Sequence, residues 1–179
     1  MNLACTIEVA LACGGWYRLC PAAESLARGA AELALARGTT DLGLTWPSAV
    51  ELGITLTDAA GQRQLNREYR GQDEPTNVLA FPVWEAGTRL PPGAPVLLGD
   101  VVLALEIVAQ EATEQEKPLD DHLVHLTVHG VLHLLGYDHQ TQGEAATMES
   151  LERSILAQLG IPDPYREPKS SIQPAAIQP

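Results

Sequence analysis

Three of the five histidines in this 179-residue chain lie within the stretch HGVLHLLGYDH, residues 129 to 139. His129 and His133 are four residues apart, so on a helix both imidazoles project from one face, one turn apart. Gly136 can adopt the left-handed conformation that ends a helix, and the reversal can bring His139 back toward the same point. Three imidazoles with an open fourth position are typical of a catalytic zinc site. The spacing therefore predicts one Zn²⁺ ion bound by His129, His133 and His139, with one position open.

Two further histidines, His122 and His125, extend the same helical stripe toward the N-terminus. We expect them to support the ligands from behind or to lie exposed, rather than to bind the ion. The ligand spacing also fits the metzincin pattern HExxHxxGxxH, in which the glutamate is the general base of a protease. Gly130 occupies that position here. A zinc peptidase is therefore the alternative interpretation, and the missing carboxylate weighs against it.

Arginines form the second group with recognisable chemistry. Arg63, Arg67 and Arg70 are spaced i, i+4 and i+7, as on one face of a helix. Residues 61 to 72 contain these three arginines and one acidic residue, a local charge of +2 in a chain with a net charge of −12. Guanidinium groups bind phosphate oxygens through paired hydrogen bonds. Arg70 is the candidate catalytic residue. For Arg63 and Arg67, substrate binding and pairing with neighbouring acids at the surface are equally good interpretations.

The composition limits the possible partners and the compartment. A net charge of −12 argues against general coating of nucleic acid, so any role on nucleic acid depends on a local basic patch. No run of 18 or more apolar residues is present, and the first residues lack the basic region of a signal peptide. The three cysteines are odd in number and form no CxxC pair, which argues against a framework of disulfides. Free thiols of this kind indicate a reducing cytoplasm. We expect a cytoplasmic protein with neither a membrane nor DNA as a partner.

Strand and helix patterns alternate along the chain and predict one α/β (α+β) domain, residues 1–161. Its mixed central sheet has about four strands packed with helices, and the metal site lies at the end of a long helix. Residues 162–179 contain five prolines and little apolar content, which predicts a disordered tail. The expected strands are 6–12, 50–58, 76–83 and 97–105. The expected helices are 22–38 closed by Gly38, 58–69 capped by Asp58, 106–116, 118–135, and a last one closed by Gly160.

Four segments carry a resemblance to a known family. HGVLHLLGYDH, LNREYRGQDEPTNVLAFP (65–82), LLGDVVLA (97–104) and DPY (163–165) resemble, in order and spacing, the YbeY family of bacterial endoribonucleases. The resemblance covers roughly residues 50 to 166. It departs at Ala80, where serine is frequent, at Asn77, where aspartate is common, and at Gly130, where serine alternates with glycine. None of these positions is a predicted ligand.

The resemblance implies that His129, His133 and His139 bind zinc and that Arg70 works beside the metal. It also implies a single-strand-specific, zinc-dependent endoribonuclease that acts in small-subunit rRNA 3′-end processing and ribosome quality control. Ribosomal RNA and small-subunit components would then be its partners. Asp138, next to a ligand, is expected to orient an imidazole or to serve as a base. Either water or the ribose 2′-hydroxyl can be the nucleophile. A non-catalytic ribosome-assembly factor with structural zinc is a further alternative.

Overall fold

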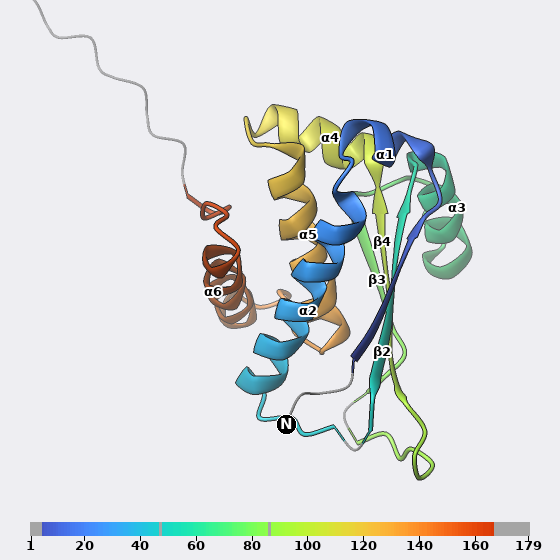
Figure 1. The fold of residues 1–179 in the computed structure, drawn as a ribbon, viewed down its shortest axis with the longest axis vertical. Helices are drawn as coiled ribbons and strands as arrows, with labels where there is room; N and C mark the ends of the chain where they lie inside the picture. The colour runs from blue at the N-terminus through green and yellow to red at the C-terminus, as the bar shows by residue number, and fades with distance from the viewer. Residues whose placement is uncertain (1–4, 47, 86, 167–179) are drawn as a thin grey trace, which may run out of the picture.

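A four-stranded mixed sheet forms the centre of the protein in the computed structural model, which describes residues 5–46, 48–85 and 87–166 (Figure 1). The strands are β1 (Cys5–Leu11), β2 (Val50–Thr57), β3 (Val78–Pro82) and β4 (Val96–Ala104). Their order is β1-β2-β4-β3; β1, β2 and β4 are parallel, and β3 is antiparallel to β4. The predicted fold class, a single α/β domain with a mixed sheet of four strands, is confirmed.

Helices cover the two faces of the sheet unequally. The helices are α1 (Gly14–Leu19), α2 (Ala23–Asp41), α3 (Ala59–Arg70), α4 (Leu105–Glu114), α5 (Leu119–Leu134) and α6 (Gln142–Gln158). Helices α2 and α5 lie side by side on one face, α6 packs outside them, and α3 lies on the opposite face (Figure 1). None of the described helices is both long and apolar enough to span a membrane.

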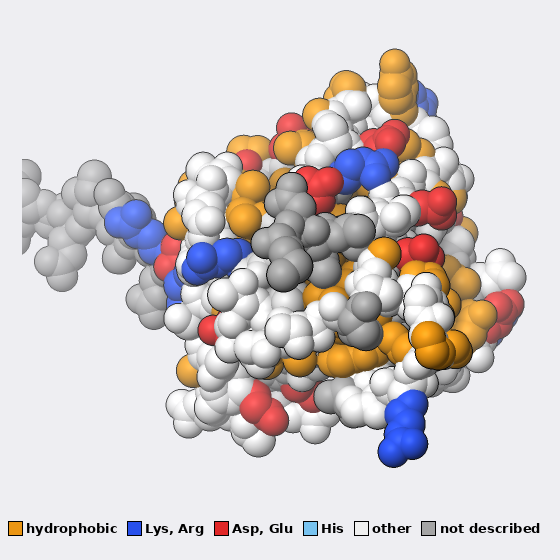
Figure 2. Space-filling model, turned by 60° about the horizontal axis from the view of Figure 1, so that its bottom comes forward, with side chains coloured by type: hydrophobic (Ala, Val, Ile, Leu, Met, Phe, Trp, Pro, Cys, Tyr) orange, Lys and Arg blue, Asp and Glu red, His pale blue; other side chains and the backbone are white. Residues whose placement is uncertain are grey.

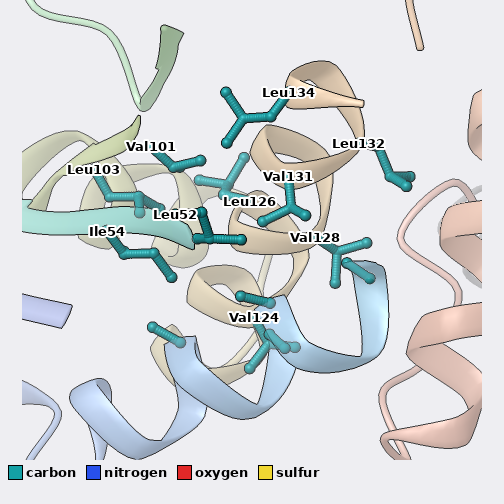
Figure 3. Close-up of a cluster of buried hydrophobic side chains, with 14 of the residues drawn as sticks. Leu52, Ile54, Val101, Leu103, Val124, Leu126, Val128, Val131, Leu132 and Leu134 are labelled. Atoms are coloured by element: carbon teal, nitrogen blue, oxygen red, sulfur yellow. The ribbon is translucent and has the colours of Figure 1, made fainter. Parts of the chain in front are cut away.

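The hydrophobic core lies between the sheet and the two helices α2 and α5. Figure 3 shows side chains of β2, including Leu52 and Ile54, and of β4, including Val101, facing those of α5, including Val131. Strand β4 lies between two other strands and is apolar at nearly every position; seven of its nine residues are buried, and Leu97 and Asp100 are exposed. Burial of α5 on most sides fixes the helix that carries His129 and His133.

The predicted helix ends agree with the structure in part. The carboxylate of Asp58 accepts a hydrogen bond from the backbone N–H of Gly61 at 2.7 Å, the predicted cap of α3. The prediction that Gly38 ends α2 is wrong, because the helix continues to Asp41. A Cβ atom at Gly38 would lie 2.5 Å from Leu135 Cδ1, so this glycine allows close packing of α2 on the end of α5. Helix α1, which contains the buried Trp16, was not predicted.

The segment after α6 is not all tail. The sequence predicts a disordered tail from residue 162, but residues 162–166 fold back onto α6, where Arg153 bonds to Asp163 and its guanidinium lies over the Tyr165 ring. The proline content of this stretch favours disorder, but the two side-chain contacts hold it in one conformation. The rest of the predicted tail, residues 167–179, lies outside the described residues.

Gly99 in β4 provides a test of the sheet geometry. Its φ is +134°, and a Cβ atom there would collide with the carbonyl oxygen of Phe81 on β3. We expect Gly99→Ala to lower the free energy of unfolding by about 2 kcal/mol or more. The control is Gly29→Ala in α2, where a Cβ meets no atom within 4 Å and helix propensity predicts a gain of about 0.5–1 kcal/mol. Urea unfolding measures both, and equal stabilities for the two variants would contradict this sheet geometry.

Candidate metal centre and adjoining cleft

The three predicted ligands come together at the end of α5. His129 and His133 lie on adjacent turns of the helix, and Gly136, with φ +94°, reverses the chain so that His139 returns to them. One nitrogen from each ring lies within 4.8 Å of the other two. The ring centroids are 4.5 Å apart for His129 and His133 and 5.0 Å apart for His133 and His139. The arrangement expected from the spacing is therefore present.

Hydrogen bonds on the far sides of two rings set which nitrogen faces the cluster. His129 Nδ1 lies 2.7 Å from a carboxylate oxygen of Glu152, and His133 Nδ1 lies 2.9 Å from the carbonyl oxygen of Tyr137. Because both partners are acceptors, Nδ1 carries the hydrogen and Nε2 presents a lone pair. The two Nε2 atoms are 3.0 Å apart. Two ligands of a tetrahedral ion with Zn–N bonds of 2.0–2.1 Å lie about 3.3 Å apart, so the donors fit a metal ion of this class.

Glu152 is a site residue that the sequence reasoning missed. It lies on α6 and its side chain is 0% exposed. Burial by itself would raise the pKa of Glu152, but contacts with His125, His129 and Tyr165 outweigh burial and lower this pKa to about 2. Glu152 is therefore a carboxylate at neutral pH. Its signal in the sequence was an acidic residue four positions after Met148, on the apolar stripe of a helix.

The two upstream histidines do not belong to the three-histidine cluster. His125 Nε2 lies 3.6 Å from the second oxygen of Glu152, so this ring supports the carboxylate that holds His129. His122 is buried, not exposed, and its Nε2 lies 2.7 Å from Glu111. Glu111 in turn accepts hydrogen bonds from the amide of Asn77.

A cleft of about 640 Å³ adjoins the histidines and contains Arg70. Arg70 is the last residue of α3, which ends at Gly71 in the left-handed conformation. The Arg70 guanidinium donates to the carbonyl oxygen of Ala80 at 3.0 Å and lies 5.7 Å from the centre of the Phe81 ring. These contacts hold a cation at the wall of the cleft that the three histidines also line.

Arg63 and Arg67 do not line this cleft. Arg63 pairs with the Asp73 carboxylate through two hydrogen bonds of 3.0 and 2.9 Å, and Arg67 lies 3.9 Å from the same carboxylate. Both arginines are exposed. The geometry favours the surface-pairing interpretation over substrate binding.

Asp138 lines the cleft but does not orient an imidazole. Its carboxylate accepts a hydrogen bond from the backbone N–H of His139 at 2.8 Å, and no bond to a ring nitrogen occurs within the described residues. The orienting acceptors are Glu152 and the carbonyl of Tyr137 instead. The role of Asp138 as a base stays a prediction.

Gly130 explains why the peptidase carboxylate has no place here. The residue is buried where α5 meets the sheet, and a Cβ atom would lie 2.6 Å from Val101 Cγ1 and 3.3 Å from Val78 Cγ2. A glutamate side chain at this position would collide with β4. The helix contact that positions the histidines therefore excludes the metzincin base.

The charge of the protein is mixed on the face drawn in Figure 2 and negative in total. The face turned toward the viewer in Figure 2 has acidic and basic side chains scattered among apolar ones, and its described residues form no continuous basic surface. With a net charge of −12, the chain has no general attraction for RNA. The Arg70 guanidinium in the cleft is therefore the feature that favours a phosphate group at the site.

Comparisons with known proteins give one consistent result. A sequence model of a protein family described as Endoribonuclease YbeY matches residues 24–160. A protein from Paramagnetospirillum magneticum named Endoribonuclease YbeY is 52% identical over 165 residues, which cover 90% of this chain and 98% of that protein. Its namesake from Nitrobacter hamburgensis is 52% identical over 144 residues, 80% of this chain and 73% of that protein.

A solved structure shares the fold. The solution structure of TM1509 from Thermotoga maritima superposes with a TM-score of 0.53 at 22% identity, covering 90% of this chain and all of that one. At this identity the likeness concerns the fold alone.

Metal binding is expected to stabilise the protein. At a free Zn²⁺ concentration 100 times the dissociation constant, the free energy of unfolding should rise by about 2.7 kcal/mol. His139→Gln removes one exposed donor and should abolish most of this rise, whereas Gln140→Ala at the neighbouring exposed position should keep it. Chemical unfolding with and without Zn²⁺ measures the difference. An equal rise in both variants would show that the ion binds elsewhere.

Proposed function

The chain belongs to the YbeY family of endoribonucleases, and we propose that it is a zinc-dependent enzyme that cleaves single-stranded RNA. We assign it to the maturation of small-subunit ribosomal RNA at its 3′ end and to ribosome quality control. The observation that carries the proposal is the presence of three imidazole donors and the anchored guanidinium of Arg70 in one cleft.

His129, His133 and His139 would hold the zinc ion, which when bound polarises a phosphoryl oxygen or lowers the pKa of a water molecule. Arg70 donates hydrogen bonds to the non-bridging oxygens of the phosphate and stabilises the negative charge that grows on them during attack. Its bond to the Ala80 carbonyl keeps the guanidinium oriented before the substrate arrives. Asp138, in the same cleft, is the candidate base for the attacking group, either water or the ribose 2′-hydroxyl.

A preference for single strands is supported by aromatic groups beside Arg70. Tyr69 is 71% exposed, and its ring centroid lies 5.4 Å from that of Phe81. Unpaired bases stack on such rings, whereas the bases of a duplex are already stacked on each other. An aromatic pair next to the phosphate-binding cation thus favours RNA whose bases are free.

The acidic surface supports delivery of the substrate by other components. Arg70 is the one arginine among the described residues that line the cleft, and together with a net charge of −12 this predicts weak binding to free RNA. We therefore propose that ribosomal RNA and small-subunit components together present the cleavage site. The cytoplasm is the proposed compartment, in keeping with the three free thiols, Cys5, Cys13 and Cys20.

Cleavage of a labelled single-stranded rRNA fragment tests the metal-dependent reaction. Zinc-loaded wild-type protein should cut the fragment, and His133→Ala should fall to the background rate because the ion loses a ligand. Neither protein should release peptides from casein. Equal cleavage of RNA by the two proteins would contradict the proposal, and peptide release that depends on His133 would favour the peptidase alternative.

Arg70→Ala tests the role of the guanidinium. The cleavage rate should fall by about 10²–10³-fold, the usual effect of removing one donor to a developing anion. Arg63→Ala is the matched control, because Arg63 pairs with Asp73 away from the cleft, and it should stay within about twofold of wild type. Single-turnover cleavage rates measure both. Similar losses in the two variants would indicate a general charge effect and would argue against a specific role of Arg70.

A further inference from the structure

A tyrosine from the segment after α6 reaches the carboxylate behind the metal site. The hydroxyl of Tyr165 donates a hydrogen bond to Glu152 Oε2, while Oε1 of the same carboxylate lies 2.7 Å from His129 Nδ1. The hydroxyl also lies 3.5 Å from His125 Nε2. A chain of contacts thus runs from Tyr165 through Glu152 to His129.

The Tyr165 ring is held in place by contacts that do not involve its hydroxyl. The backbone N–H of Tyr165 donates a hydrogen bond to Asp163 Oδ1 at 2.9 Å, and the same carboxylate accepts one from Arg153 Nε at 3.2 Å. The Arg153 guanidinium lies 4.9 Å from the centre of the ring. Removal of the hydroxyl alone should therefore leave the ring where it is, so its effect can be separated from that of the segment.

The buried carboxylate needs the donor that Tyr165 supplies. Glu152 is fully buried, and an ionised carboxylate without water is stable only when both oxygens receive hydrogen bonds. Without the hydroxyl, His125, at 3.6 Å, is the one partner that the described part of the chain leaves to Oε2. The carboxylate would then turn toward His125, and its bond to His129 would lengthen.

Tyr165 also forms a wall beside the ligands. A second cavity of about 370 Å³ is lined by Tyr165 together with His129 and His139, on the α6 side of the cluster. Residues 162–166 are thus adjacent to the three histidines.

We propose that Tyr165 is a positioning residue for the metal centre: its hydroxyl fixes the Glu152 carboxylate, which in turn fixes the tautomer and direction of His129. The inference rests on the proposed zinc site. Partners one step behind a metal ligand commonly change metal affinity by 10–100-fold. Tyr165 acts one step further away, so a smaller effect, about three- to tenfold, is expected from loss of its hydroxyl.

Competition for zinc between the full-length protein and a chromophoric chelator tests this role without RNA. Tyr165→Phe should raise the zinc dissociation constant about three- to tenfold. Tyr17→Phe is the matched control, because it removes an exposed hydroxyl on α1, and it should leave the constant unchanged. If wild type binds no zinc, the proposed zinc site itself fails. If wild type binds zinc and Tyr165→Phe binds it equally well, only the role of Tyr165 is overturned, even if its melting temperature falls.

A double-mutant cycle tests the route through Glu152. Glu152→Gln should weaken zinc binding by about 10–100-fold, and adding Tyr165→Phe to it should change the constant by less than about twofold. An undiminished effect of Tyr165→Phe in the Glu152→Gln background would overturn the route. At saturating zinc, RNA cleavage by Tyr165→Phe should return to near the wild-type rate. A loss that persisted would indicate direct contact with RNA and would also overturn the positioning role.

Discussion

The close contact between α5 and the sheet is the constraint on which the site depends. Gly130 has no side chain, so the helix approaches β4 until its backbone meets Val101. Apolar side chains of α5 on either side of this point pack into the core (Figure 3). This contact sets the rotation of the helix about its axis. His129 and His133, on the edge of the buried face, therefore project from the side of α5 that lines the cleft.

Two hydrogen-bond acceptors outside α5 orient the rings of His129 and His133. An imidazole on a helix face can rotate about its side-chain bonds and can carry its hydrogen on either nitrogen. Glu152 and the carbonyl of Tyr137 each bind an Nδ1 atom, so both Nε2 atoms face the same point. The buried carboxylate is costly by itself, but it is stabilised by donors from α5 and from the segment after α6. The arrangement of the three histidines is thus linked to the packing of α6 through Glu152.

The arginines show how neighbours decide the role of equivalent residues. The helical spacing is shared by three arginines, Arg63, Arg67 and Arg70. Asp73, in the turn after α3, is close to Arg63 and Arg67 and neutralises that part of the helix. Arg70 instead bonds to a backbone carbonyl, which is uncharged, so its full positive charge stays available in the cleft.

The sequence by itself determined the features that depend on a few consecutive residues. The i, i+4 spacing of His129 and His133, the reversal at Gly136 and the cap at Asp58 follow from backbone geometry, and the apolar run of β4 marked a central strand. Only the tertiary structure decided the features that join distant segments. Among them are the bond from Glu152 to His129, the place of Arg70 in the same cleft as the three histidines, and the return of residues 162–166 to α6. These contacts were not predicted because which distant side chains meet depends on how whole elements pack, and local periodicity carries no record of that packing.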